Sequence, residues 1–266
     1  MSSYKFKPFE ELPVIHDLPD PFIGPDGKRI TSKEEWPKQR EYLLSMLDYY
    51  LYGPMPPVPA FLKGEVLSRE SRFGGDVVYE TVKLCFEGFT FNIDVMRPNK
   101  PGRFPAICYT TFSKVFGTMP AEWEAVCERG YVLASFAVNE IAFDRREGGG
   151  PIYDAYPDWE GKTIMAWAWG LMRIIDYLLT CDYIDPDRII VTGCSRLGKQ
   201  ALCAAIHDTR VALAGIAGSG CAGLGCFRIL GDKNGPDQNP KRTETMGSLM
   251  YAFPHWFSEK MLPFCS

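Results

Sequence analysis

The sequence VTGCSRLGK, residues 191–199, has the residue types of a serine nucleophile placed on a sharp turn. Most turns of this kind have the pattern G-x-S-x-G, with a glycine two residues before the serine and another two residues after it. Here Gly193 stands two residues before Ser195, but the second glycine, Gly198, comes three residues after it. Arg196 follows the serine directly and Lys199 closes the motif, so two cations accompany a hydroxyl group that could take part in acyl transfer.

The elements on either side of this motif are those that such a turn requires. Residues 188–191 predict a buried strand, and residues 199–207 predict a helix that begins near Leu197. Ser195 would then lie at the carboxyl end of a strand, and at a helix N-terminus whose free N–H groups favour a developing negative charge. The simpler alternatives are that Ser195 is a helix N-cap and that Arg196 and Lys199 are solvated helix charges.

The remaining pattern predicts strands that alternate with helices. Ser32 and Glu35 have capping-box spacing and open a predicted helix that ends near Tyr52. Two β-rich segments, 77–86 and 89–96, flank the dipeptide EG and predict a hairpin. Further strands are predicted at 106–112, 131–137 and 212–217, and further helices at 121–129 and 163–179. We therefore expect one α/β domain over residues 1–266, with a mostly parallel sheet covered on both faces and an N-terminal antiparallel hairpin.

The composition excludes several classes of protein. The chain has 266 residues, of which 46% are apolar and 23% charged, as is ordinary for a globular domain. Its net charge of -4 argues against nucleic acid or an anionic membrane as the main partner. The N-terminus has no apolar run typical of a secretory signal, so we expect a cytoplasmic protein. Nine cysteines without a C-x-x-C pair predict reduced, buried thiols, and we expect neither a metal nor another cofactor.

The motif G-C-S-R-x-G-K resembles the signature of the glucuronoyl esterases, which are the carbohydrate esterase family 15 type of α/β-hydrolase. The resemblance extends to PDPFIGPDGKRIT, YGPMPP, FDRREGGG (143–150), MAWAWGLMRIIDYL and FPHWF (253–257), and runs from about residue 17 to the last residue. It implies a three-layer α/β-hydrolase-like sandwich. The family cleaves the ester between 4-O-methyl-glucuronic acid on xylan and lignin alcohols, and its members are often secreted. The partner implied is a small or glucuronoxylan-derived carbohydrate ester.

The resemblance also assigns roles to single residues. Ser195 matches the nucleophile, Arg196 matches an arginine that helps to form the oxyanion hole, and Lys199 matches a lysine that contacts sugar hydroxyl groups. Glu244, nine residues before FPHWF, matches less closely a glutamate that also binds the sugar. The role of Arg196 is physically sound, because a uronate ester is neutral whereas its tetrahedral intermediate is anionic.

The general base that a serine nucleophile needs is not evident in this sequence. His16 precedes the domain, whereas the histidine of this fold comes last in the chain. His207 lies twelve residues after Ser195 on the predicted helix, roughly 18 Å away at 1.5 Å per residue, and is expected at the surface or at the helix end. His255 lies in an aromatic cluster, and the matching histidine of the family is not the catalytic one.

The resemblance places the family's catalytic histidine, two further strands and a sugar-stacking tryptophan beyond Ser266. The usual position of the triad acid corresponds to Gly218, and a second known position again follows Ser266. We therefore expect a fold without its last strands. Three hypotheses remain open. The chain is a shortened esterase acting on glucuronate esters, or on acetyl or methyl esters of sugars; it is an inactive carbohydrate-binding relative; or Glu244 and His255 form an improvised triad with Ser195.

Overall fold

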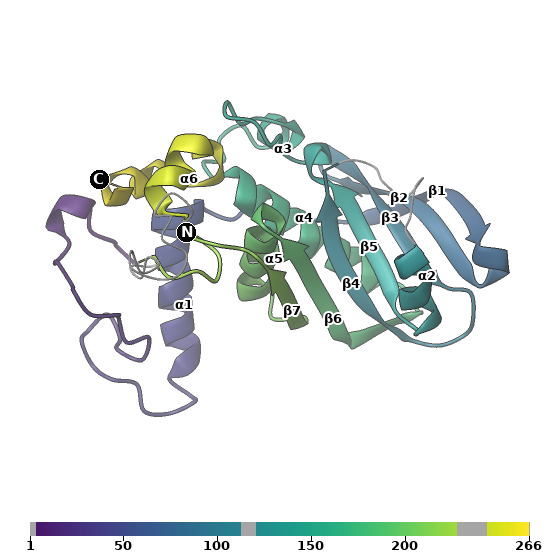
Figure 1. Ribbon diagram of the computed structural model, residues 1–266, viewed down its shortest axis with the longest axis horizontal. Coiled ribbons are helices and arrows are strands. Elements are labelled where there is room, and N and C mark those ends of the chain that lie inside the picture. The colour runs from purple at the N-terminus through teal and green to yellow at the C-terminus, as the bar shows by residue number, and fades with distance from the viewer. Residues whose placement is uncertain (1–3, 113–120, 228–243, 266) are drawn as a thin grey trace, which may run out of the picture.

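One seven-stranded sheet organises the protein, as the computed structural model of residues 4–112, 121–227 and 244–265 shows (Figure 1). The strand order across the sheet is β1-β2-β3-β5-β4-β6-β7. The strands are β1 (Lys63–Arg72), β2 (Val77–Phe86), β3 (Phe89–Pro98), β4 (Phe104–Thr111), β5 (Val132–Ala137), β6 (Ile184–Cys194) and β7 (Val211–Ala217).

The directions of the strands confirm the expected mixture of parallel and antiparallel pairing. β5, β4, β6 and β7 pair in parallel, whereas β3 pairs antiparallel with both β2 and β5. The strands β2 and β3 form the predicted hairpin. β1, which pairs antiparallel with β2, was not predicted. Its sequence, KGEVLSRESR, is almost entirely exposed and lacks an apolar alternation, so backbone hydrogen bonds to β2 rather than burial hold it in the sheet.

Helices cover both faces of the sheet. α2 (Ala121–Glu128) lies over a small core on one face, and α4 (Thr163–Leu178) and α5 (Arg196–His207) pack over the main core on the other. Strand residues alternate between the two cores: Ala106 and Cys108 of β4 belong to the main core, whereas Tyr109 belongs to the smaller one. These layers confirm the α/β sandwich that the sequence predicts.

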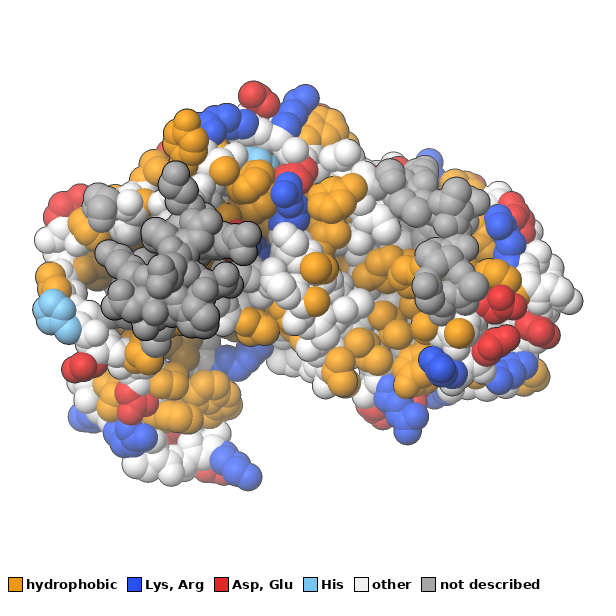
Figure 2. Space-filling view, in the orientation of Figure 1, with side chains coloured by type: hydrophobic (Ala, Val, Ile, Leu, Met, Phe, Trp, Pro, Cys, Tyr) orange, Lys and Arg blue, Asp and Glu red, His pale blue; other side chains and the backbone are white. Residues whose placement is uncertain are grey.

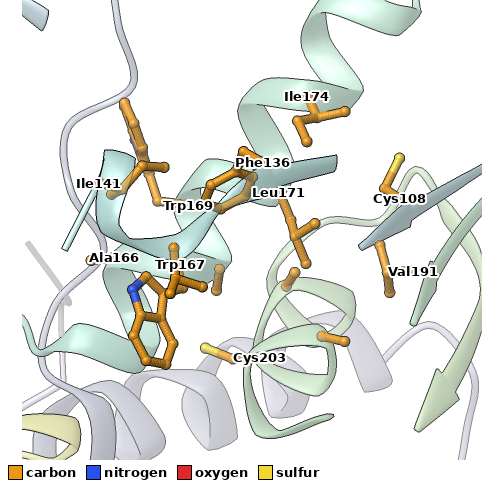
Figure 3. Packing of buried hydrophobic residues seen from close by; sticks show 14 of the residues in the cluster. Cys108, Phe136, Ile141, Ala166, Trp167, Trp169, Leu171, Ile174, Val191 and Cys203 are labelled. Atoms are coloured by element: carbon orange, nitrogen blue, oxygen red, sulfur yellow. The ribbon is translucent and has the colours of Figure 1, made fainter. Parts of the chain in front are cut away.

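The helix α4 is the centre of the main core, because it is buried on nearly all sides. Its Trp167 and Leu171 lie among Phe136, Ile141 and other apolar side chains from the strands and loops (Figure 3). The Trp167 indole N–H donates to the Ala142 carbonyl at 2.9 Å, so its polar atom is satisfied inside the core. This packing gives α5, which carries Ser195 at its start, a rigid support.

Three further helices lie outside the sheet layers: α1 (Trp36–Leu47), α3 (Pro151–Ala155) and α6 (Met246–Ala252). The side chain of Glu35 accepts from the backbone N–H groups of Thr31 and Ser32, at 2.8 and 3.0 Å, as half of a capping box would. Regular α-helix nevertheless begins only at Trp36, later than the spacing predicts, and a π-helical turn, Asp48–Tyr52, extends it to the predicted end.

The N-terminal segment and the C-terminal helices lie at the end of the molecule opposite β1 (Figure 1). The rings of Phe9 and Phe264 pack edge to face there, with their centroids 4.8 Å apart. On the face shown in Figure 2, basic and acidic side chains are interspersed outside the grey residues, and no broad basic patch is visible. Among the described residues, no helix is long and apolar enough to cross a membrane.

His207 is the last residue of α5, as expected, and joins it to the π-helical turn after α1; its side chain is only 9% exposed, so it does not lie free at the surface. Its Nδ1 lies 2.7 Å from the Cys203 carbonyl oxygen, and its Nε2 lies 2.8 Å from Asp48 Oδ1. Both partners only accept hydrogen bonds, so both ring nitrogens must carry protons. Burial by itself lowers the pKa of His207, but the neighbouring Cys203 and the hydrogen bond to Asp48 outweigh it and raise the pKa to about 11. A cation at a helix C-terminus is also favoured by the helix dipole.

Replacing His207 with glutamine should lower the free energy of unfolding by about 1–3 kcal/mol at neutral pH. The folded-state pKa is raised, so the contribution of His207 is complete below about pH 6.5 and declines as the pH rises toward 11. Urea denaturation of the wild type and His207→Gln at pH 6, 8 and 10 should give a difference that shrinks with pH. His16→Gln, at an exposed position, is the control and should change nothing. A difference independent of pH would contradict the charged state assigned to His207.

Candidate active site

Ser195 is exposed on the turn between β6 and α5, with the backbone angles φ 58° and ψ -127°. A side chain rarely occupies this region, and an L-residue held there stores strain. The turn is fixed by the Ser195 N–H, which donates to the Ala217 carbonyl of β7 at 3.0 Å. Ser195 occupies the N-cap position of α5, but its hydroxyl makes no capping hydrogen bond to the helix, so capping does not explain the serine side chain.

The two glycines of the motif are required by close packing around this turn. A Cβ at Gly193 would lie 2.2 Å from the carbonyl oxygen of Leu197, and a Cβ at Gly198 would lie 2.9 Å from that of Ala217. Real Cβ atoms essentially never approach other atoms so closely. The glycine three residues after the serine therefore lets the helix approach the sheet closely.

Arg196 follows Ser195, and three aromatic rings lie near its guanidinium group. Its guanidinium carbon is 4.6 Å from the ring centroid of Trp256, 4.8 Å from that of Phe253 and 5.7 Å from that of Phe112. Nη1 forms an ion pair of 2.6 Å with Asp144 Oδ2. The side chain is only 28% exposed, so Arg196 is not the solvated helix charge of the simpler alternative.

Lys199 is buried one turn further along α5, with a side chain that is 2% exposed. Its ammonium group lies 3.3 Å from Oε2 of Glu244, which is 40% exposed and also accepts from the backbone N–H of Cys221 at 2.8 Å. The Lys199 ammonium is also 5.8 Å from the Trp256 ring centroid. Lys199 and Arg196 therefore both lie near the Trp256 ring, and Glu244, which is distant in the sequence, pairs with Lys199.

None of the three histidines contacts Ser195. His16 is exposed, and both nitrogens of His207 are engaged elsewhere. His255 Nε2 lies 3.0 Å from Asp144 Oδ1, whereas its Nδ1 is buried without a hydrogen-bond partner. The triad hypothesis required His255 to contact Ser195 and Glu244. In the described part of the chain it pairs instead with Asp144.

Asp144 is the residue that the sequence analysis did not single out. Its carboxylate, 12% exposed, accepts from Arg196, from His255 and, at 2.8 Å, from the indole N–H of Trp256. Burial favours the neutral acid, but the hydrogen bonds from His255, Trp256 and Arg196 outweigh burial and hold the pKa of Asp144 below its usual value. The available signal was that Asp144 lies in FDRREGGG and Trp256 in FPHWF, two of the motifs that carry the resemblance.

Two other predictions concern the surroundings of the site. Gly218, the position matched to the triad acid, directly follows β7, and a Cβ there would lie 3.8 Å from Sγ of Cys194. All nine cysteines are free, as expected, but only four of them are buried. Cys194 and Cys226 are exposed, so the expectation of burial is wrong for them, and the remaining three are half-buried. Within residues 4–112, 121–227 and 244–265, no group of three or more His, Cys, Asp or Glu side chains could hold a metal ion.

A family model described as fungal glucuronyl esterase matches residues 82–266, which is well over half of the chain. The chain belongs to the glucuronoyl esterase family. It is 33% identical over 227 residues to the 4-O-methyl-glucuronoyl methylesterase of Podospora anserina, which covers 82% of this chain and 44% of that protein. Membership of this family of esterases confirms the resemblance inferred from the motifs.

Solved structures of glucuronoyl esterases share the fold. A promiscuous CE15 esterase from a marine bacterial metagenome is 26% identical, with a TM-score of 0.77 over 96% of this chain and 73% of that one. A variant of the glucuronoyl esterase from Sporotrichum thermophile, in complex with methyl 4-O-methyl-β-D-glucopyranuronate, is also 26% identical, with a TM-score of 0.69 over 93% and 64% of the two chains. The chain spans about half the length of the curated relatives it matches, with shares such as 44%, 52% and 51%.

Replacing Ser195 with glycine should give a more stable protein than replacing it with alanine, by about 1 kcal/mol. Glycine relieves the strain of the positive φ angle at this position. The free energy gained in this way exceeds the loss that results from the greater conformational entropy of glycine in the unfolded chain. Urea denaturation of the two variants measures the difference. The same pair of substitutions at Ser45, inside α1, is the control and should have the opposite order, because glycine weakens a helix interior. Equal stability of the two Ser195 variants would contradict the strain at this turn.

Proposed function

We propose that this chain hydrolyses esters of 4-O-methyl-glucuronic acid, with Ser195 as the nucleophile. The observation that carries the proposal is an exposed serine on a strained turn, followed directly by a guanidinium group held among aromatic rings. The name of the Podospora anserina relative and the ligand of the Sporotrichum thermophile complex support the substrate class.

In this proposal the Ser195 hydroxyl attacks the carbonyl carbon of the uronate ester and forms a tetrahedral intermediate. Arg196 and the free N–H groups at the start of α5 stabilise the oxyanion, which exists only after attack. The alcohol leaves with a proton, and water then hydrolyses the acyl-enzyme to release the uronate and free Ser195. Lys199 and Glu244 bind hydroxyl groups of the sugar, a role supported by their pairing beside Trp256.

The proposal includes no general base from the three histidines, because none of them contacts Ser195. Without a base the hydroxyl remains protonated, and only binding and oxyanion stabilisation accelerate the reaction, by roughly 10³–10⁴-fold over water. We therefore propose that residues 1–266 alone are a slow esterase. The second hypothesis, an inactive relative that only binds carbohydrate, corresponds to a hydrolysis rate no higher than the rate in water. The similarity to the marine esterase, which is described as promiscuous, supports other sugar esters as additional substrates.

The test is hydrolysis of benzyl glucuronate by residues 1–266, with imidazole added as an external base. Imidazole should raise the rate of the wild type and leave Ser195→Ala at the rate of imidazole alone. Arg196→Ala should lower kcat by about 10²–10³-fold, whereas Lys199→Ala should mainly raise KM. Lys33→Ala, at an exposed position far along the sequence, is the control. Equal activity of the wild type and Arg196→Ala would refute the oxyanion role.

The same assay without imidazole tests the absence of a base. The wild type should turn over far more slowly than the roughly 1–10³ s⁻¹ of ordinary enzymes. A normal rate that is abolished by His255→Ala would show that His255 moves to Ser195 during catalysis, and that the improvised triad is real.

A further inference from the structure

We infer that Asp144 is a positioning residue, which fixes the Arg196 guanidinium in the orientation required beside Ser195. This inference rests on the proposed function, in which Arg196 stabilises the oxyanion. In this inference Asp144 acts through Arg196 alone.

The carboxylate is anchored independently of Arg196. Its Oδ1 accepts from His255 Nε2 at 3.0 Å and from the Trp256 indole N–H at 2.8 Å, which leaves Oδ2 for Arg196 Nη1 at 2.6 Å. Both donors to Oδ1 belong to the short helical turn Pro254–Trp256, where their side chains are buried. Asp144 is therefore a fixed acceptor, so the direction of the Arg196 side chain is set by a group that does not move with it.

Two aromatic rings also lie close to the guanidinium. The rings of Phe253 and Trp256 stack on each other at 3.9 Å with an interplanar angle of 5°, and both centroids lie within 5 Å of the Arg196 guanidinium carbon. These rings and the ion pair together restrict the movement of the guanidinium. A guanidinium has five N–H donors, and only one is used by Asp144 in the described contacts. The remaining donors are available for an oxyanion formed at Ser195.

Preorganisation of this kind is what makes a donor useful in catalysis. A donor that already has its final orientation needs no rearrangement when charge develops, whereas a free arginine side chain would first lose rotamer freedom. The ion pair also persists at neutral pH, because the pKa of Asp144 is held below its usual value. The orientation of Arg196 therefore depends on three distant parts of the chain: the loop at 144, the turn at 195–196 and the segment 254–256.

The experiment combines a structural readout with a kinetic one in Asp144→Asn. By NMR at low temperature, the wild type should show resolved N–H signals for the Arg196 guanidinium, assigned by their absence in Arg196→Lys. Asp144→Asn should lose them while its thermal unfolding remains cooperative. Asp154→Asn, an exposed carboxylate on α3, is the matched control and should keep them. Absent Arg196 signals in the wild type, or their persistence in Asp144→Asn, would overturn the inference.

The kinetic readout is hydrolysis of benzyl glucuronate in the presence of imidazole. Asp144→Asn should lower kcat at least tenfold with little change in KM, and should have no further effect in an Arg196→Ala background. An equal loss in both backgrounds would show that Asp144 does not act through Arg196. If no variant shows Ser195-dependent turnover, the proposed function fails, and the NMR result still decides whether Asp144 fixes Arg196.

Discussion

The close approach of α5 to β6 is the constraint on which the site depends. Only glycine fits at position 193, since a Cβ would meet the Leu197 carbonyl. Because the helix lies this close to the strand, the chain passes from β6 to α5 in a sharp turn at Ser195. That residue takes a positive φ angle and presents its hydroxyl to solvent at the start of a helix. The strain is sustained because α5 packs on α4, whose buried side chains form the centre of the main core.

The two cations of the motif have different environments, which suit different tasks. Arg196 is partly exposed, lies near aromatic rings and is paired with Asp144, so it can donate to a carbonyl or oxyanion oxygen beside the serine. Lys199 is fully buried and paired with a half-exposed glutamate, so its charge is compensated within the protein. The Trp256 ring lies near both cations, so the segment 253–257 forms one wall of the site.

Histidine shows how one residue type serves different purposes according to its neighbours. His207 faces two acceptors and is held as a cation that joins α5 to α1. His255 donates to the Asp144 carboxylate and contributes to the restraint of Arg196 through it. Neither contacts Ser195. The sequence already excludes His207 by its distance along the helix, whereas it leaves His255 as a candidate base because of its order in the chain.

The sequence by itself determined the elements of the elbow, which are a strand, a sharp turn at Ser195 and a helix. Local patterns suffice for these, because the strand β6, the two glycines and the helix α5 are contiguous in the chain. The sequence did not reveal β1, whose residues are mostly exposed and which pairs with β2 through the backbone and through the ion pair of Arg69 with Glu80. Nor did it assign a role to Asp144, because its three donors lie 52, 111 and 112 residues away along the chain. Only the tertiary structure brings them together, since the packing of distant segments, and not any local spacing, decides which acceptor each buried donor meets.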